Sequence, residues 1–289
     1  MTRYELTGRI IAGIDGSHAT PAVCDAAAWA SQRLDADILA LHVLERSEFP
    51  LESDLSGNLM MGEREHLLEE LVELDRQRNK IALEQGKLQL KAARDRIEAA
   101  GATRIDTKQR HDSLIDTVLE LEPETRLLIM GRQGEAHDEE LNVVGSHLEN
   151  VIRVVKQPLL ITTRQFVAPE SFMLAFDGSK TAQAALERVA QSPLLKGLPC
   201  HLVMVSDDDD NHRKQLDKAA ETLSGVGFDV TPVLISGQVT ETLLNYVADQ
   251  NIGITVMGTR GHSRLRRFFV GSTTTEYMRR TDRAVLLLR

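Results

Sequence analysis

The chain has 289 residues, of which 42% are hydrophobic, and it carries a formal net charge of −9. This length is enough for two domains of ordinary size, each with its own core. The acidic balance argues against a general nucleic-acid binder, and no apolar run approaches the roughly 18–20 residues that span a bilayer. The acidic excess lies in residues 1–165, with 20 basic and 29 acidic residues, whereas residues 166–289 hold 14 of each.

The two cysteines, Cys24 and Cys200, each lie in an apolar stretch. Two isolated cysteines predict no disulfide framework, so we expect buried, unreactive thiols. The first ten residues lack the charged-then-apolar pattern of a signal peptide. We therefore expect a cytoplasmic protein with no membrane association.

Two stretches of the chain repeat each other at the scale of a domain. An apolar run ends in Asp15-Gly16-Ser17, and a second apolar run ends in Asp177-Gly178-Ser179. A helical pattern follows each, over residues 19–34 and 181–191. Each half then reaches a second predicted strand, at Ile38–Leu44 and Cys200–Val205.

The halves differ after this second strand, because the first half carries an insertion over residues 45–100. Its first part has loop composition, and Glu63–Ala100 reads as a long charged helix with apolar residues at helical spacings. The simpler interpretation is an amphipathic helix packed on the sheet. The alternative is a helix that binds a partner. The second half has only Asn211–Gly225 at the corresponding place.

The remaining elements run in parallel in the two halves. Strands alternate with helices, which predicts right-handed βαβ units and an α/β fold with a parallel sheet in each half. We expect a linker near Arg164–Glu170. The predicted pairs are third strands at Ile105–Arg110 and Asp229–Ile235, third helices at Ser113–Leu121 and Thr240–Asp249, fourth strands at Arg126–Met130 and Ile254–Met257, fourth helices opened by Gly145-Ser146 and Gly271-Ser272, and closing strands at Leu159–Thr163 and Ala284–Leu288.

A glycine loop after the fourth strand of the second half has the composition of a phosphate site. The pattern is Gly258-x2-Gly261-x9-Gly271-Ser272, and a capping-box spacing joins Thr273 to Glu276. Glycines allow a close backbone approach, and a helix N-terminus suits an anion. The loop also holds four arginines and no acid: Arg260, Arg264, Arg266 and Arg267. An ordinary loop with turn glycines is the alternative.

This glycine pattern, together with Asp-Gly-Ser after strand one in both halves, resembles the ATP-binding universal stress proteins, in a tandem arrangement. The resemblance covers nearly the whole chain. It implies two domains, residues 1–165 and 166–289, each a doubly wound, Rossmann-like, five-stranded parallel sheet of order 3-2-1-4-5 with helices on both faces. Ligands of such sheets bind at the switch in strand order. That switch lies between strands one and four, which carry Asp177 and the Gly258 loop.

The resemblance also implies the ligand and its contacts. The cofactor would be ATP, AMP or ADP, with Mg²⁺ as a companion of the phosphates. Asp177 and the backbone near Val205 would hold the adenosine portion. The phosphate contacts would be Gly258, Arg260, Gly261, His262, Gly271, Ser272 and Thr273.

The first half keeps the fold elements but departs from the phosphate pattern. Ten residues, not nine, separate its second and third glycines, and they include Glu135, Asp138, Glu139 and Glu140 in place of the arginines. Carboxylates there would repel a triphosphate. We expect a weaker site that holds adenosine alone or no ligand, formed by Asp15, Val43, Gly131, Gly134, Gly145 and Ser146.

The acidic run Asp207–Asp210 follows the second strand of the second half and is flanked by His201 and His212. It could hold a divalent ion, but capping of the following helix is the favoured interpretation. No paired His or Cys spacing supports a transition-metal site, so we predict no resident metal. We expect His111, Asp112 and His137 to be exposed loop residues.

The predicted function is therefore that of a regulatory, adenine-nucleotide-binding protein of the stress response, with slow ATP hydrolysis at most. An enzyme on a related fold would need a Ser-Gly-Gly-x-Asp-Ser loop or a His-x-x-His motif near strand one, and neither is present. A module for a non-nucleotide ligand or a protein partner is the other alternative. The two closing strands are apolar edges, and we expect them to pair antiparallel as an intramolecular pseudo-dimer. Beyond this pseudo-dimer, the long helix could join two copies of the chain as a homodimer, or the protein could bind an unknown protein partner.

Overall fold

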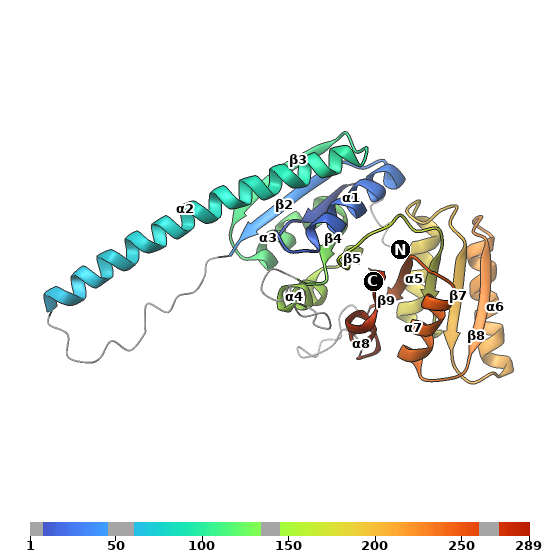
Figure 1. Ribbon diagram of the computed structural model, residues 1–289. Helices are drawn as coiled ribbons and strands as arrows, with labels where there is room; N and C mark the ends of the chain where they lie inside the picture. The colour runs from blue at the N-terminus through green and yellow to red at the C-terminus, as the bar shows by residue number, and fades with distance from the viewer. Residues whose placement is uncertain (1–7, 46–60, 134–144, 260–271) are drawn as a thin grey trace.

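The computed structural model describes residues 8–45, 61–133, 145–259 and 272–289 (Figure 1). Strands and helices alternate along both halves, as the sequence predicts. The first half consists of β1 (Arg9–Gly13), α1 (Thr20–Leu34), β2 (Ile38–Leu44), α2 (Met61–Ala99), β3 (Ile105–His111), α3 (Leu114–Leu121), the 3₁₀ turn η1 (Glu122–Glu124), β4 (Thr125–Gly131), α4 (Ser146–Val154) and β5 (Leu159–Thr162).

The second half repeats this order after a short connection, in which Val167 is 80% exposed. Its elements are β6 (Phe172–Ala175), α5 (Lys180–Gln191), β7 (Cys200–Val205), α6 (Asp210–Ser224), β8 (Val230–Ile235), α7 (Val239–Asp249), β9 (Ile254–Gly258), α8 (Ser272–Arg280) and β10 (Ala284–Leu288). Most boundaries lie within two residues of those that the sequence predicts.

All ten strands form one continuous sheet, in the order β3-β2-β1-β4-β5-β10-β9-β6-β7-β8. Each half therefore has the predicted order 3-2-1-4-5, and its strands are parallel. The two halves meet where β5 and β10 pair antiparallel, with Ile161 opposite Val285 and Leu159 opposite Leu287. This pairing confirms the expected intramolecular contact between the two closing strands.

The sheet is buried on both faces, which explains why its central strands are largely apolar. Successive residues of β1 alternate between two cores. Ile10 and Ala12 belong to the core that includes residues of α1, α5, α6 and the C-terminal part of α2, whereas Ile11 belongs to the core that includes residues of α3, α4, α7 and α8. None of the helices in the described part of the chain is long and apolar enough to cross a membrane.

Arginine side chains join the halves at this seam. Arg132, 9% exposed, donates from Nη1 to the carbonyl oxygens of Met278 and Thr281 at the C-terminal end of α8. From the other half, Arg289 donates to the carbonyl oxygen of Ile152 in α4. Cations at a helix C-terminus satisfy its free carbonyl groups and the helix dipole. The helices α4 and α8 are thus each held by an arginine from the opposite half.

The long helix α2 packs on the domain only through its C-terminal part. Leu90, Ala93 and Ile97 are buried there, and Gly86 lies so close to the sheet that a Cβ atom would come 2.6 Å from Cδ2 of His42. The N-terminal part of the helix projects away from the sheet (Figure 1), and every described side chain from 70 to 81 is exposed. The predicted helix is confirmed, but more than half of it lies off the sheet.

The capping box that the spacing of Thr273 and Glu276 suggests is wrong. Helix α8 begins at Ser272, so Thr273 lies inside the helix, and Glu276 pairs with Arg280 at 3.8 Å. Helix α4 has Gly145 as its N-cap, with no side-chain hydrogen bond. The capping-box spacing recurs inside helices, so spacing alone does not locate the first helical residue.

Both thiols are buried, as predicted: Cys24 and Cys200 are each 1% exposed. Burial raises the pKa of each thiol to about 12, because the thiolate would lose its hydration.

Candidate functional site

The switch in strand order lies between β1 and β4 in the first half and between β6 and β9 in the second. Helices leave opposite faces of the sheet on the two sides of such a switch, so their first turns diverge and leave a crevice. In both halves a pocket lies at this point, beyond the carboxyl ends of the strands.

An Asp-Gly-Ser turn places an aspartate in the lining of each pocket. Gly16 and Gly178 have φ angles of +79° and +71°, in the left-handed region that favours glycine. In the second half Oδ1 of Asp177 accepts a hydrogen bond from the backbone N–H of Ser179, at 3.0 Å. In the first half Oδ1 of Asp15 accepts from the backbone N–H of Ser17 at 3.1 Å and from its hydroxyl at 2.7 Å. The acids therefore serve turn chemistry and line the pockets at the same time.

The second-half pocket has a volume of about 190 Å³. It brings Asp177 and Val205 together with Gly258 and with Thr273 at the start of α8, four of the residues that the sequence singles out. Thr273 is half-buried, and Ser272 is exposed and does not line the pocket. The other predicted contacts, Arg260, Gly261, His262 and Gly271, lie outside the described residues. The remaining lining side chains are mostly apolar or hydroxyl-bearing: Ala175, Phe176, Ser179, Thr181, Ala182, Val203, Val239, Leu243, Met257 and Thr274.

The first-half pocket is larger, about 320 Å³, and gathers Asp15, Val43, Gly131 and Gly145 as predicted. The predicted Gly134, and the acids that follow it, lie outside the described residues. The same holds for the side chain of Ser146.

Three polar residues of this pocket escape the sequence analysis: His42, Glu45 and His147. His42 is 7% exposed, and its Nδ1 lies 2.6 Å from the carbonyl oxygen of Ile14. Oε1 of Glu45 accepts from the backbone N–H of Leu114 at 3.2 Å and lies 3.3 Å from Nδ1 of His147. The sequence did not indicate His42, because a histidine inside an apolar strand is expected to be a core residue. It did not indicate Glu45, because only the folded structure brings this residue close to the first turn of α4.

The glycines that end β4 and β9 are required by packing as well as by any ligand. A Cβ atom at Gly258 would lie 2.6 Å from the carbonyl oxygen of Thr181, and one at Gly131 would lie 2.7 Å from Cβ of Ala19. Contacts this short do not occur, so a side chain at either position would push the strand away from the start of α5 or α1. The glycine pattern thus follows partly from the close contact of strand and helix.

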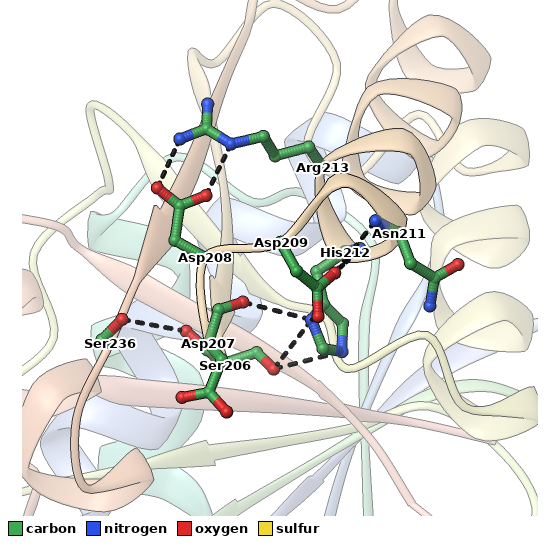
Figure 2. Close-up of polar contacts among 8 residues, drawn as sticks. All are labelled: Ser206, Asp207, Asp208, Asp209, Asn211, His212, Arg213 and Ser236. Atoms are coloured by element: carbon green, nitrogen blue, oxygen red, sulfur yellow. Dashed lines mark hydrogen bonds and ion pairs between the residues drawn. The ribbon is translucent and has the colours of Figure 1, made fainter.

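The acidic run caps α6, in agreement with the favoured interpretation (Figure 2). Oδ1 of Asp209 accepts from the backbone N–H groups of Asn211 and His212, at 2.9 and 2.8 Å, and Asp208 pairs with Arg213. The hydrogen bond from the His212 backbone holds the pKa of Asp209 below its usual range. Among the described residues no group of three or more His, Cys, Asp or Glu side chains is placed to hold a metal ion.

His111 and Asp112 are exposed, as predicted, but His111 is the last residue of β3 and not part of a loop. His137 lies outside the described residues. His201 is not part of the acidic cluster, because its Nδ1 lies 2.7 Å from the hydroxyl of Tyr246 on α7.

The fold and the pockets together define a tandem, doubly wound α/β protein with a pocket at the switch point of each half. A family model described as "Universal stress protein family" matches residues 7–163 and again residues 170–289. The chain therefore belongs to the universal stress protein family.

Two relatives are similar over nearly the full length. Universal stress protein Slr1230 of Synechocystis is 32% identical over 279 residues, covering 95% of this chain and 97% of the relative. The crystal structure of a universal stress protein from Archaeoglobus fulgidus has a TM-score of 0.72 at 20% identity, covering 99% of this chain and 98% of the other. The second comparison supports the fold alone.

Proposed function

We propose that the protein binds an adenine nucleotide, ATP foremost, in the second-half pocket, and that it acts as a nucleotide-responsive regulator rather than as a fast enzyme. One observation carries the proposal. A single crevice joins a carboxylate, the carboxyl end of β7 and the N-terminal turn of α8, through Asp177, Val205 and Thr273. Ligands of doubly wound sheets bind in the crevice at this switch point, beyond the carboxyl ends of the strands.

Each group has a chemical role in this proposal. The Asp177 carboxylate would accept hydrogen bonds from ribose hydroxyls or the adenine amino group. The free N–H groups at the start of α8 suit a phosphate. Asp177 is the sole carboxylate among the described lining residues, so Mg²⁺ would be held chiefly by the phosphates themselves. The phosphate contacts of Arg260, Gly261, His262 and Gly271 remain predictions from the sequence.

The two pockets are proposed to differ in ligand, with residues 1–165 and 166–289 as the two domains. Glu45 lies at the first-half pocket, 3.3 Å from His147 at the start of α4, where the second half has Thr273. A carboxylate beside the helix N-terminus competes with a phosphate for the same place. The first half is therefore expected to bind adenosine without phosphates, or no nucleotide.

Calorimetric titration of the full-length protein with ATP, ADP, AMP and adenosine tests both parts. The variants Asp177→Ala and Thr273→Glu should weaken ATP binding at least about tenfold, which corresponds to about 1.4 kcal/mol. The matched first-half variants Asp15→Ala and His147→Glu should leave the ATP titration unchanged. If only the first-half variants lose ATP binding, the nucleotide binds in the first half and the proposal is wrong. Absence of heat with all four ligands would favour a module for a different ligand.

A further inference from the structure

Helix α2 carries a stripe of exposed apolar side chains with a seven-residue repeat, which begins on its projecting part and continues to the start of its packed part. Leu74, Ile81 and Leu88 are 54%, 59% and 67% exposed. Seven residues fall about 20° short of two helical turns, so the three side chains lie along one face of the helix. In the sequence the same spacing continues back to Leu67. Such a repeat is typical of a helix that pairs with another helix in a coiled coil.

This stripe is not the face by which α2 contacts its own domain. Leu90 and Ile97 are buried against the domain, and Val72 and Leu83 continue their line along the helix. At about 100° per residue, Leu74 lies roughly 200° from Val72. The stripe therefore points away from the sheet, and nothing in the described part of this chain covers it.

The charges of α2 are divided into two blocks that meet near the middle of the stripe. Residues 63–75 contain six acids and one arginine, whereas residues 76–91 contain five bases and one acid. The boundary between the blocks lies between Leu74 and Ile81, which is also the midpoint of the apolar repeat. Two helices of this kind repel each other when parallel and attract when antiparallel, because the acidic block of each then lies along the basic block of the other.

We propose that α2 is a self-association surface, on which a second copy of this chain docks its own α2 in antiparallel orientation. Leu74 of one copy then lies opposite Ile81 of the other, on both sides of a twofold axis between these positions. A symmetric contact of this kind is isologous and closes at two copies. Arg78 and Gln85 fall at the other core position of the repeat and weaken the contact, so the dimer is reversible.

The first experiment measures the mass of the full-length protein by sedimentation equilibrium over a range of concentrations. We expect a reversible dimer of twice the 32.1 kDa chain mass. Leu74→Glu or Ile81→Glu should weaken it at least about tenfold. The matched control is Val72→Glu, which adds the same charge at a side chain of similar exposure (63%) on the opposite face. It should change the dissociation constant less than about threefold. A monomer at every concentration, or disruption by Val72→Glu but not by Leu74→Glu, would overturn the proposal.

The second experiment tests orientation by disulfide formation, with the native thiols buried and out of reach. Leu74→Cys and Ile81→Cys proteins are mixed under reducing conditions and then oxidised. The antiparallel pairing predicts a covalent dimer in the mixture and little in either protein alone, because like positions are then about 10 Å apart along the axis. A disulfide in Leu74→Cys alone would show a parallel pair and contradict the proposal. Rising salt should weaken the dimer, since the two charge blocks attract each other.

Discussion

Gly131 and Gly258 end equivalent strands, and each meets the start of a helix where a side chain would collide. We predict that Gly258→Ala lowers the free energy of unfolding by about 2–3 kcal/mol, because the obstacle is the rigid backbone of Thr181. Urea denaturation measures this. Gly13→Ala is the matched control, since its Cβ would lie at an ordinary 3.4 Å from Met130 and the second half has Ala175 at that place. Equal midpoints for the two variants would contradict the packing explanation.

Cys24 and Cys200 supply a prediction about pH. In the folded protein each thiol has a pKa of about 12, well above that of an unfolded cysteine. The unfolded chain therefore loses these protons first, so the stabilisation is complete below about pH 8.5 and is lost as the pH rises towards 12. We expect a thiol reagent at pH 8 to modify neither cysteine in native buffer and both in urea. Rapid modification of the native protein would mean that one thiol is accessible.

The sequence predicts the site residues that belong to a repeated motif. It does not predict those that only the fold brings to the pocket. Asp15 and Asp177 stood out because the same Asp-Gly-Ser follows both first strands, and the structure places both at pockets. His42 and Glu45 did not stand out, because an isolated histidine in an apolar strand and an acid at a strand end are common in any fold.

At the scale of elements, α4 and α8 are held from the opposite half by Arg289 and Arg132. We predict that Arg132→Ala lowers the free energy of unfolding by about 2–3 kcal/mol, because it removes a charged donor from two carbonyl groups at the buried end of α8. Arg153→Ala is the control. Within the described part of the chain, Arg153 makes a single i,i+4 ion pair, with Glu149 at 3.8 Å near the surface, so its loss should cost less than about 0.5 kcal/mol. Equal costs would mean that Arg132 contributes no more than a surface charge.

The strands and helices themselves were predicted nearly to their boundaries, because two copies of one pattern support each other and periodicity is clear in both. The position of α2 relative to the sheet was not predicted. The sequence shows an amphipathic helix, but a helix of 39 residues is about 58 Å long, and periodicity does not tell how much of it the sheet can cover. A glycine inside a helix lowers its intrinsic stability, but Gly86 is the place where the helix closely approaches His42.

At the scale of the whole molecule, the antiparallel pairing of β5 with β10 and the arginine contacts hold the halves together. We predict that cutting the connection, at a protease site inserted after the exposed Val167, leaves both fragments in one particle on gel filtration. Denaturant should separate them. If the fragments elute apart in native buffer, the covalent link rather than the seam keeps the halves joined.

The pairing of β5 with β10 also decides which strands remain at the edges of the sheet. Those edges are β3 and β8, and both are unsuited to accept a further strand. Asp106, Lys108 and Arg110 place charges along β3, and Pro232 in β8 lacks a backbone N–H to donate. The two apolar edges face each other inside the molecule instead. The folded chain is therefore protected against sheet growth from molecule to molecule, and a lesion that opened the seam would expose two aggregation-prone strands at once.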